Sequence, residues 1–157
     1  MSRFEALVRR LLAEAEAARS AAVGRDPALA GLSSAELVAI GLATVDWERA
    51  ARASGAGEWE PLPRDSLLGA TVRRARASAA PSVLLLEPDT EGPLAASLAR
   101  FGEGLAAVYL RTPAGGRART RPGRFARAGP LGPARLLPGP AWGPHVVALE
   151  PAATIKP

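Results

Sequence analysis

Four short apolar runs limit what this chain can fold into: residues 37–45, 82–87, 105–111 and 144–150. Each run has the length of a buried strand, and even the longest is far too short to cross a bilayer. Segments with helical spacing precede and separate these runs, so the order of elements predicts an α+β fold. We also expect a cytoplasmic protein without a secretory signal, because glutamates interrupt the apolar residues near the N-terminus.

The first segment, residues 2–22, predicts an N-terminal helix. Ser2 and Glu5 have the spacing of a capping box, in which each side chain satisfies a free backbone amide. One apolar stripe follows at helical spacing: Phe4, Leu7, Val8, Leu11, Leu12 and Ala15. The stripe can pack on its own domain, which we favour, or dock on another chain. We therefore divide the chain into a helical extension, residues 1–30, and a domain over residues 36–157.

The next segment, residues 37–45, is compatible with a helix, which Ser33 and Glu36 could cap, or with a strand, and we favour a strand followed by a helix. Val38, Ile40 and Leu42 alternate in strand fashion. The following helix spans residues 46–54 and ends at Gly55.

Proline and glycine mark most of the later boundaries. We expect a loop over residues 55–65, where Gly and Pro dominate, and a strand over residues 67–76 with arginines on its wet face. Pro93 is typical of a helix start, and Gly102 of a left-handed stop. Residues 112–135 show no clear period.

Composition excludes some kinds of chemistry. The chain has no cysteine and a single histidine, His145, so disulfides, thiolate chemistry and a metal site built on paired histidines within one chain are excluded. The net charge of +5 comes almost wholly from arginine. The basic stretch with Arg117, Arg119 and Arg121 lacks the interleaved aromatic residues that stack on bases. We therefore expect no nucleic-acid partner.

Three stretches resemble a known family. They are residues 37–51 (LVAIGLATVDWERAA), residues 84–110 (LLLEPDTEGPLAASLARFGEGLAAVYL) and residues 136–151 (LLPGPAWGPHVVALEP). In this order they are similar to vicinal-oxygen-chelate proteins, the glyoxalase and bleomycin-resistance group, and above all to its methylmalonyl-CoA epimerase-like members. The resemblance covers about half the chain. It implies paired βαβββ modules whose curved sheet forms a cleft, here with an added N-terminal helix.

Active members of that family hold one divalent metal in the cleft, and the resemblance places its ligands on Ala39, Leu84, Ala107 and Ala148. None of these side chains offers the oxygen or nitrogen donor that such a metal needs. We therefore expect no metal and no other cofactor. The favoured interpretation is a non-catalytic member that binds a small molecule or serves as an accessory or assembly protein.

Strand alternation around these positions gives a candidate ligand-binding cleft. Its candidate residues are Tyr109, Glu150, Trp142, His145, Leu84, Ala107, Ala148 and Ala39. Such a mostly apolar face suits an apolar or aromatic small molecule, or it is filled by its own side chains. Tyr109 and Glu150 are also a possible acid/base pair, although a packed tyrosine and a solvated carboxylate are the commoner arrangement.

The alternative interpretation is a metal-dependent isomerase or lyase with an unrecognised site. The donors for it would be Glu87, Asp89, Glu150 and His145. Under either interpretation the second module is short and rich in Gly and Pro, which leaves sheet surface uncovered. We therefore expect a homodimer or a subunit of a larger complex.

Overall fold

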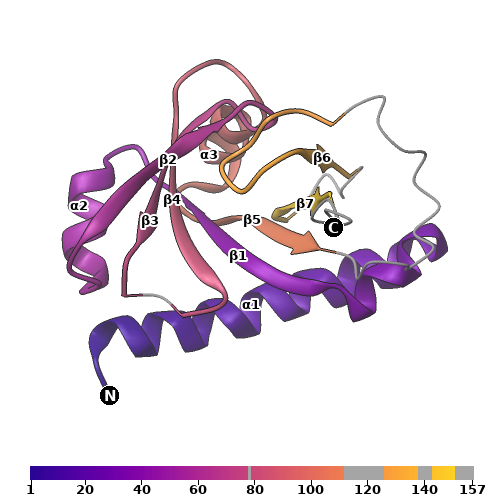
Figure 1. Ribbon diagram of the computed structural model, residues 1–157, viewed down its shortest axis with the longest axis horizontal. Helices are drawn as coiled ribbons and strands as arrows, with labels where there is room; N and C mark the ends of the chain where they lie inside the picture. The colour runs from indigo at the N-terminus through magenta and orange to yellow at the C-terminus, as the bar shows by residue number, and fades with distance from the viewer. Residues whose placement is uncertain (78, 112–125, 138–142, 151–157) are drawn as a thin grey trace, which may run out of the picture.

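The computed structural model describes residues 1–77, 79–111, 126–137 and 143–150. Their strands form one curved seven-stranded sheet in the order β2-β3-β4-β1-β5-β7-β6, with a long helix across one side (Figure 1). In chain order the elements are α1 (Arg3–Arg25), the 3-10 helix η1 (Pro27–Ser34), β1 (Glu36–Ala43), α2 (Trp47–Ser54), β2 (Trp59–Asp65), β3 (Ala70–Ala75), β4 (Ser82–Pro88), α3 (Pro93–Phe101), β5 (Gly104–Arg111), β6 (Ala134–Leu136) and β7 (His145–Leu149). None of the described helices is long and apolar enough to span a membrane.

The sheet consists of two related halves. In the first half, β1 pairs parallel with β4, β4 antiparallel with β3, and β3 antiparallel with β2. In the second half, β5 pairs parallel with β7, and β7 antiparallel with β6. Antiparallel pairing of β1 with β5 joins the halves. The predicted α+β fold with repeated modules and an added N-terminal helix is thus confirmed, although residues 112–125 lie outside the described part.

The N-terminal helix packs on the sheet of its own chain. Its capping box is present, since the Ser2 hydroxyl accepts a hydrogen bond from the Glu5 amide at 3.1 Å and the Glu5 carboxylate accepts one from the Ser2 amide. Phe4 and Leu11 are buried in one cluster with Val83 of β4 and other strand residues. The apolar stripe of α1 is therefore buried against its own chain, and α1 contributes to the same hydrophobic core as the sheet.

Apolar side chains cover both faces of the sheet. The helix face, against which α1 packs, buries a cluster that includes Ile40, Val83 and Val108. The inner face, on the other side, buries a second cluster in which Leu94 of α3 takes part; its strand residues are Ala39, Ala43, Ala70, Val72, Leu84, Leu86, Ala106, Ala107, Tyr109, Ala134, Val147 and Leu149. With both faces buried, the strands β1, β4, β5 and β7 are nearly continuously apolar, as the short runs in the sequence indicated.

Two predicted boundaries are wrong. The segment expected to be a loop over residues 55–65 contains strand β2, whose Pro61 and Pro63 masked the strand pattern. Proline is compatible with a strand at the edge of a sheet, and β2 is an edge strand. The expected strand over residues 67–76 starts only at Ala70, because a turn precedes it. The predicted start of α3 at Pro93 is confirmed.

Candidate functional site at the inner face of the sheet

Three of the four positions assigned to metal ligands lie close together on the inner face. Gly41 of β1 is paired with Leu84 of β4 on one side and with Ala107 of β5 on the other. Ala39, two residues before Gly41 on β1, is paired with Tyr109. The side chains of Ala39, Leu84 and Ala107 are all fully buried.

The fourth position is on the wrong face. Ala148 belongs to the cluster on the helix face, whereas Val147 and Leu149 belong to the inner-face cluster. Side chains alternate along a strand, so an error of one residue in the alignment moves a residue to the opposite face. The prediction that Ala148 shares the cleft face is therefore corrected to its two neighbours, which are equally apolar.

A buried tyrosine occupies the centre of the inner face. The Tyr109 hydroxyl donates a hydrogen bond of 2.7 Å to Oδ2 of Asp65, at the end of β2. The carboxylate that Tyr109 meets is thus Asp65 and not Glu150, the less favoured partner that the sequence left open. Burial, with the nearby charge of Asp65, raises the pKa of Tyr109 well above its usual value, so the hydroxyl stays protonated near neutral pH.

The Asp65 carboxylate is fully engaged. Its other oxygen, Oδ1, accepts hydrogen bonds from the backbone amides of Leu67 and Leu68 at 2.9 and 3.0 Å. Asp65 is only 1% exposed, and its three hydrogen bonds offset the cost of burying it. Asp65 therefore fixes the turn between β2 and β3 against the sheet.

This turn and α3 cover the inner face. Leu68 and Leu94 are fully buried in the cluster that holds Ala107 and Tyr109. The Leu94 amide donates a hydrogen bond of 3.1 Å to the Leu68 carbonyl, which joins the turn to the start of α3. The sequence left open whether the cleft is empty or filled. At these positions it is filled by the side chains of the chain itself.

His145 lies beside the filled region, at the start of β7. Burial lowers its pKa, while a hydrogen bond to the Pro93 backbone and the charge of Asp65 act in the opposite direction. An opening of about 660 Å³ lies next to it, lined also by Ser97 and Phe101 of α3. Trp142, another predicted cleft residue, lies outside the described residues.

The donors of the alternative metal site are not brought together. Glu87 accepts a hydrogen bond from the Trp47 amide at 3.2 Å, on the helix face. Asp89 forms a two-point ion pair with Arg64, which lowers the pKa of Asp89. Within the described ranges, no group of three or more His, Asp or Glu side chains could hold a metal ion.

The residues of the inner face do not fit a divalent metal. The assigned positions Ala39, Leu84 and Ala107 carry no donor, and both oxygens of Asp65 already accept hydrogen bonds. Sequence reasoning missed Asp65 because the segment around it was assigned to a loop. The available signal was a carboxylate directly before Ser-Leu-Leu-Gly, a sequence in which Asp accepts hydrogen bonds from the following amides.

Several solved structures have the same architecture. Methylmalonyl-CoA epimerase from Mycobacterium tuberculosis is 18% identical, with a TM-score of 0.60 over 76% of this chain and 90% of that one. A methylmalonyl-CoA epimerase in complex with methylmalonyl-CoA and NH4+ is 20% identical, with a TM-score of 0.57 over 78% of this chain and 99% of that one. A hypothetical protein from Bacillus halodurans is 18% identical, with a TM-score of 0.56 over 79% of this chain and 99% of that one.

The chain therefore has the vicinal-oxygen-chelate fold, as the resemblance implied. At this level of identity the likeness establishes the fold and leaves the activity to the site. No family model matches the sequence, and no curated protein matches it either.

Proposed function

We propose that this protein is a metal-free, non-catalytic member of the vicinal-oxygen-chelate fold that binds a small molecule or acts as an accessory protein. One observation carries the proposal: the buried Tyr109–Asp65 pair fills the inner face beside Ala39, Leu84 and Ala107. In related folds with a metal, a cleft at this place must admit both the ion and the substrate. Here the same space is packed.

The chemistry of the pair supports the same proposal. A general base must offer a free lone pair to the substrate, within hydrogen-bonding distance. Asp65 is buried beneath the turn, and the protonated hydroxyl of Tyr109 already donates to it. A structural role in closing the face accounts for all of these contacts.

The opening beside His145 is the place where a ligand would reach this side of the sheet. Exposed Phe101 and the half-buried imidazole give it an aromatic and a polar contact. Association with a second copy or with another protein, in the cytoplasm, remains part of the proposal. The outer edge of β2, which pairs only with β3 among the described strands, is the surface that would favour it.

The test is proton exchange on methylmalonyl-CoA, the ligand named for one structural neighbour. The full chain is incubated with this thioester in D2O, with and without added Co2+, and deuterium incorporation at the α-carbon is followed by mass spectrometry. We expect no exchange above the buffer rate under either condition. Exchange that depends on Co2+ would support the isomerase alternative.

Exchange without metal would instead point to acid/base chemistry by the side chains. In that case Asp65→Asn and His145→Gln should abolish it, with Asp89→Asn as the matched carboxylate control. Either kind of exchange would overturn the non-catalytic proposal.

A further inference from the structure

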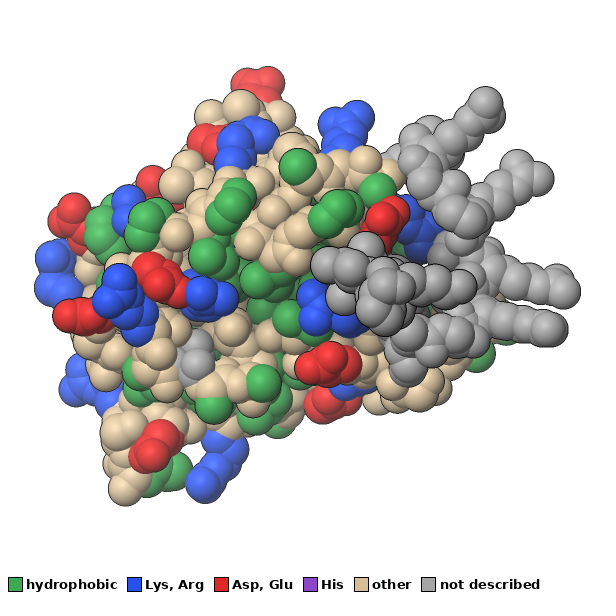
Figure 2. Space-filling model, in the orientation of Figure 1, with side chains coloured by type: hydrophobic (Ala, Val, Ile, Leu, Met, Phe, Trp, Pro, Cys, Tyr) green, Lys and Arg blue, Asp and Glu red, His purple; other side chains and the backbone are tan. Residues whose placement is uncertain are grey.

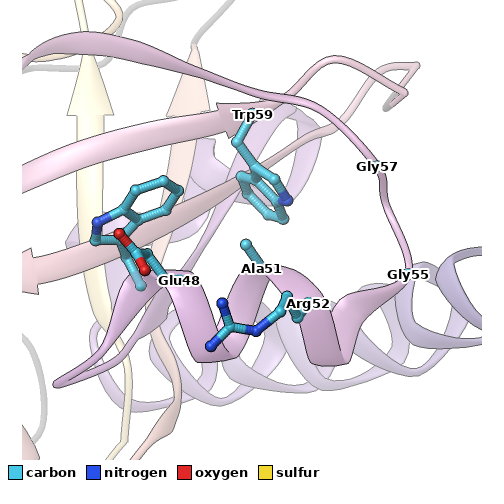
Figure 3. A pocket seen from close by; sticks show the side chains of 7 residues that line it. Glu48, Ala51, Arg52, Gly55, Gly57 and Trp59 are labelled. Atoms are coloured by element: carbon cyan, nitrogen blue, oxygen red, sulfur yellow. The ribbon is translucent and has the colours of Figure 1, made fainter.

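A separate pocket lies between α2 and the start of β2. Its volume of about 490 Å³ is within the usual range for small-molecule sites. Trp47, at the start of α2, and Trp59, at the start of β2, both line it. Figure 3 shows the Trp59 indole facing Ala51 of α2 across this pocket. Two of the three tryptophans in the chain are thus placed around one cavity.

Trp47 is held in position by two contacts. Its backbone amide donates a hydrogen bond of 3.2 Å to the Glu87 carboxylate. The Arg73 guanidinium carbon lies 3.7 Å from the centre of the Trp47 ring, a close cation–π contact. The ring is therefore a preformed wall, which lowers the entropy that a ligand loses on stacking against it.

Trp59 is brought opposite α2 by a glycine turn. Gly55 ends α2 in the left-handed conformation with φ of 72°, and Gly57 has φ of 77°, a region that disfavours other residues. The indole Nε1 of Trp59 is buried and has no hydrogen-bond partner among the described residues. The Trp59 side chain is thus held in the wall of the pocket with its polar edge turned away from solvent.

The rim of the pocket carries one anion and one cation. Glu48 and Arg52 are four residues apart on α2, both exposed, and both line the pocket. Neither forms an ion pair with another described residue, whereas nearby Glu58 and Glu60 are paired with arginines. Glu48 would repel an anionic ligand and Arg52 a cationic one, so the rim favours a neutral ligand with both a donor and an acceptor.

We propose that this pocket binds an aminopurine ring of the adenine type. Its flat surface stacks against the indoles, as bases stack on aromatic side chains. Its amino group donates to Glu48, and a ring nitrogen accepts from Arg52, because such a base presents a donor beside an acceptor on one edge. This site lies away from the inner face, so the inference stands whether or not that face is catalytic.

The experiment titrates the full chain with adenosine and follows the three tryptophan indole N–H signals in 15N-labelled protein by NMR. Assignment comes from Trp47→Phe, Trp59→Phe and Trp142→Phe. We expect saturable shifts of the Trp47 and Trp59 signals. Inosine, which has an oxygen in place of the amino group, should bind about tenfold more weakly, since it turns an acceptor toward Glu48.

Variants of the two rim residues test the proposed contacts with the base without disturbing the hydrophobic core. Glu48→Gln should abolish the preference for adenosine over inosine, and Arg52→Gln should weaken adenosine binding severalfold. Arg9→Gln and Glu14→Gln, both at exposed positions of α1, are the matched controls and should bind as the wild type does. Absence of saturable shifts at millimolar adenosine, equal binding of the two nucleosides, or indifference to both rim variants would overturn the proposal.

Discussion

Among the described residues, the two halves of the sheet share one pairing pattern but differ in the lengths of their strands. In the first half, β1 to β4 have six to eight residues each, and α2 packs beside them. In the second half, β5 has eight residues, β7 has five and β6 only three. Tyr109 of β5 links the second half to Asp65 of β2 through a buried hydrogen bond.

Figure 2 shows acidic and basic side chains interspersed over the first half of the sheet. The basic side chains that the structure describes are often paired, as Arg64 is with Asp89 and Arg74 with Glu60. The expectation of no nucleic-acid partner stays a prediction.

The largest difference between the halves should appear on truncating their inner-face leucines. Leu84→Ala in β4 removes a fully buried side chain and should lower the free energy of unfolding by about 3 kcal/mol. Leu136→Ala in β6 removes a partly buried one and should cost about 1 kcal/mol. Urea unfolding of both variants measures this. Equal losses would show that the second half is packed as tightly as the first.

The link between the halves can be broken at Asp65. Asp65→Ala leaves the Tyr109 hydroxyl and the amides of Leu67 and Leu68 without their acceptor, and it should cost about 2 to 3 kcal/mol. Tyr109→Phe should cost about 1 kcal/mol, and the double variant should be less destabilised than the sum, because the two groups interact. Asp89→Ala on the exposed surface is the control. Additive effects would mean that the pair does not connect the halves.

Much of this architecture could be predicted from the sequence, because its signals are local. Apolar runs, the Ser2 capping box and the helix start at Pro93 depend on residues a few positions apart. The Tyr109–Asp65 contact joins residues 44 positions apart, and no periodicity encodes such a pair. Ala148 was assigned to the wrong face of the sheet because the predicted register was shifted by one residue. Long-range contacts and strand register thus decide the site, and one sequence specifies them poorly.

Gly41 of β1, which lies between β4 of the first half and β5 of the second, should tolerate no added side-chain volume. A Cβ at Gly41 would lie 2.6 Å from Leu86 Cδ1 and 3.2 Å from the Ala107 methyl group. Gly41→Ala should therefore lower the free energy of unfolding by about 1 to 2 kcal/mol through overpacking. Thermal melting compares it with Gly31→Ala, where a Cβ meets nothing within 4 Å. A fully stable Gly41→Ala variant would show that the filled face still has free space.

The smallest expected effect is the pH dependence of stability that Glu103 contributes, directly before β5. Glu103 accepts hydrogen bonds from Thr44, Val45 and Arg49, and these hold its pKa at about 2, with the Arg49 bond as the largest cause. A carboxylate with a lowered pKa stabilises the fold above its unfolded pKa of 4.5, and this contribution is lost as pH falls toward 2.

Glu103 is partly exposed, so the contribution should stay under about 1 kcal/mol. Acid unfolding of Glu103→Gln should show a weaker pH dependence in this window, with Glu58→Gln unchanged from the wild type. A steeper dependence in Glu103→Gln would contradict the assigned network.

The inner face is packed, and we propose that it holds no divalent metal. The most direct test of this proposal is the metal content of untagged protein, measured by mass spectrometry after dialysis against cobalt and zinc salts and removal of free ions. We expect only trace metal, with no change in the melting temperature on adding either salt or a chelator. About one tightly held ion per chain, with loss of stability on chelation, would contradict it.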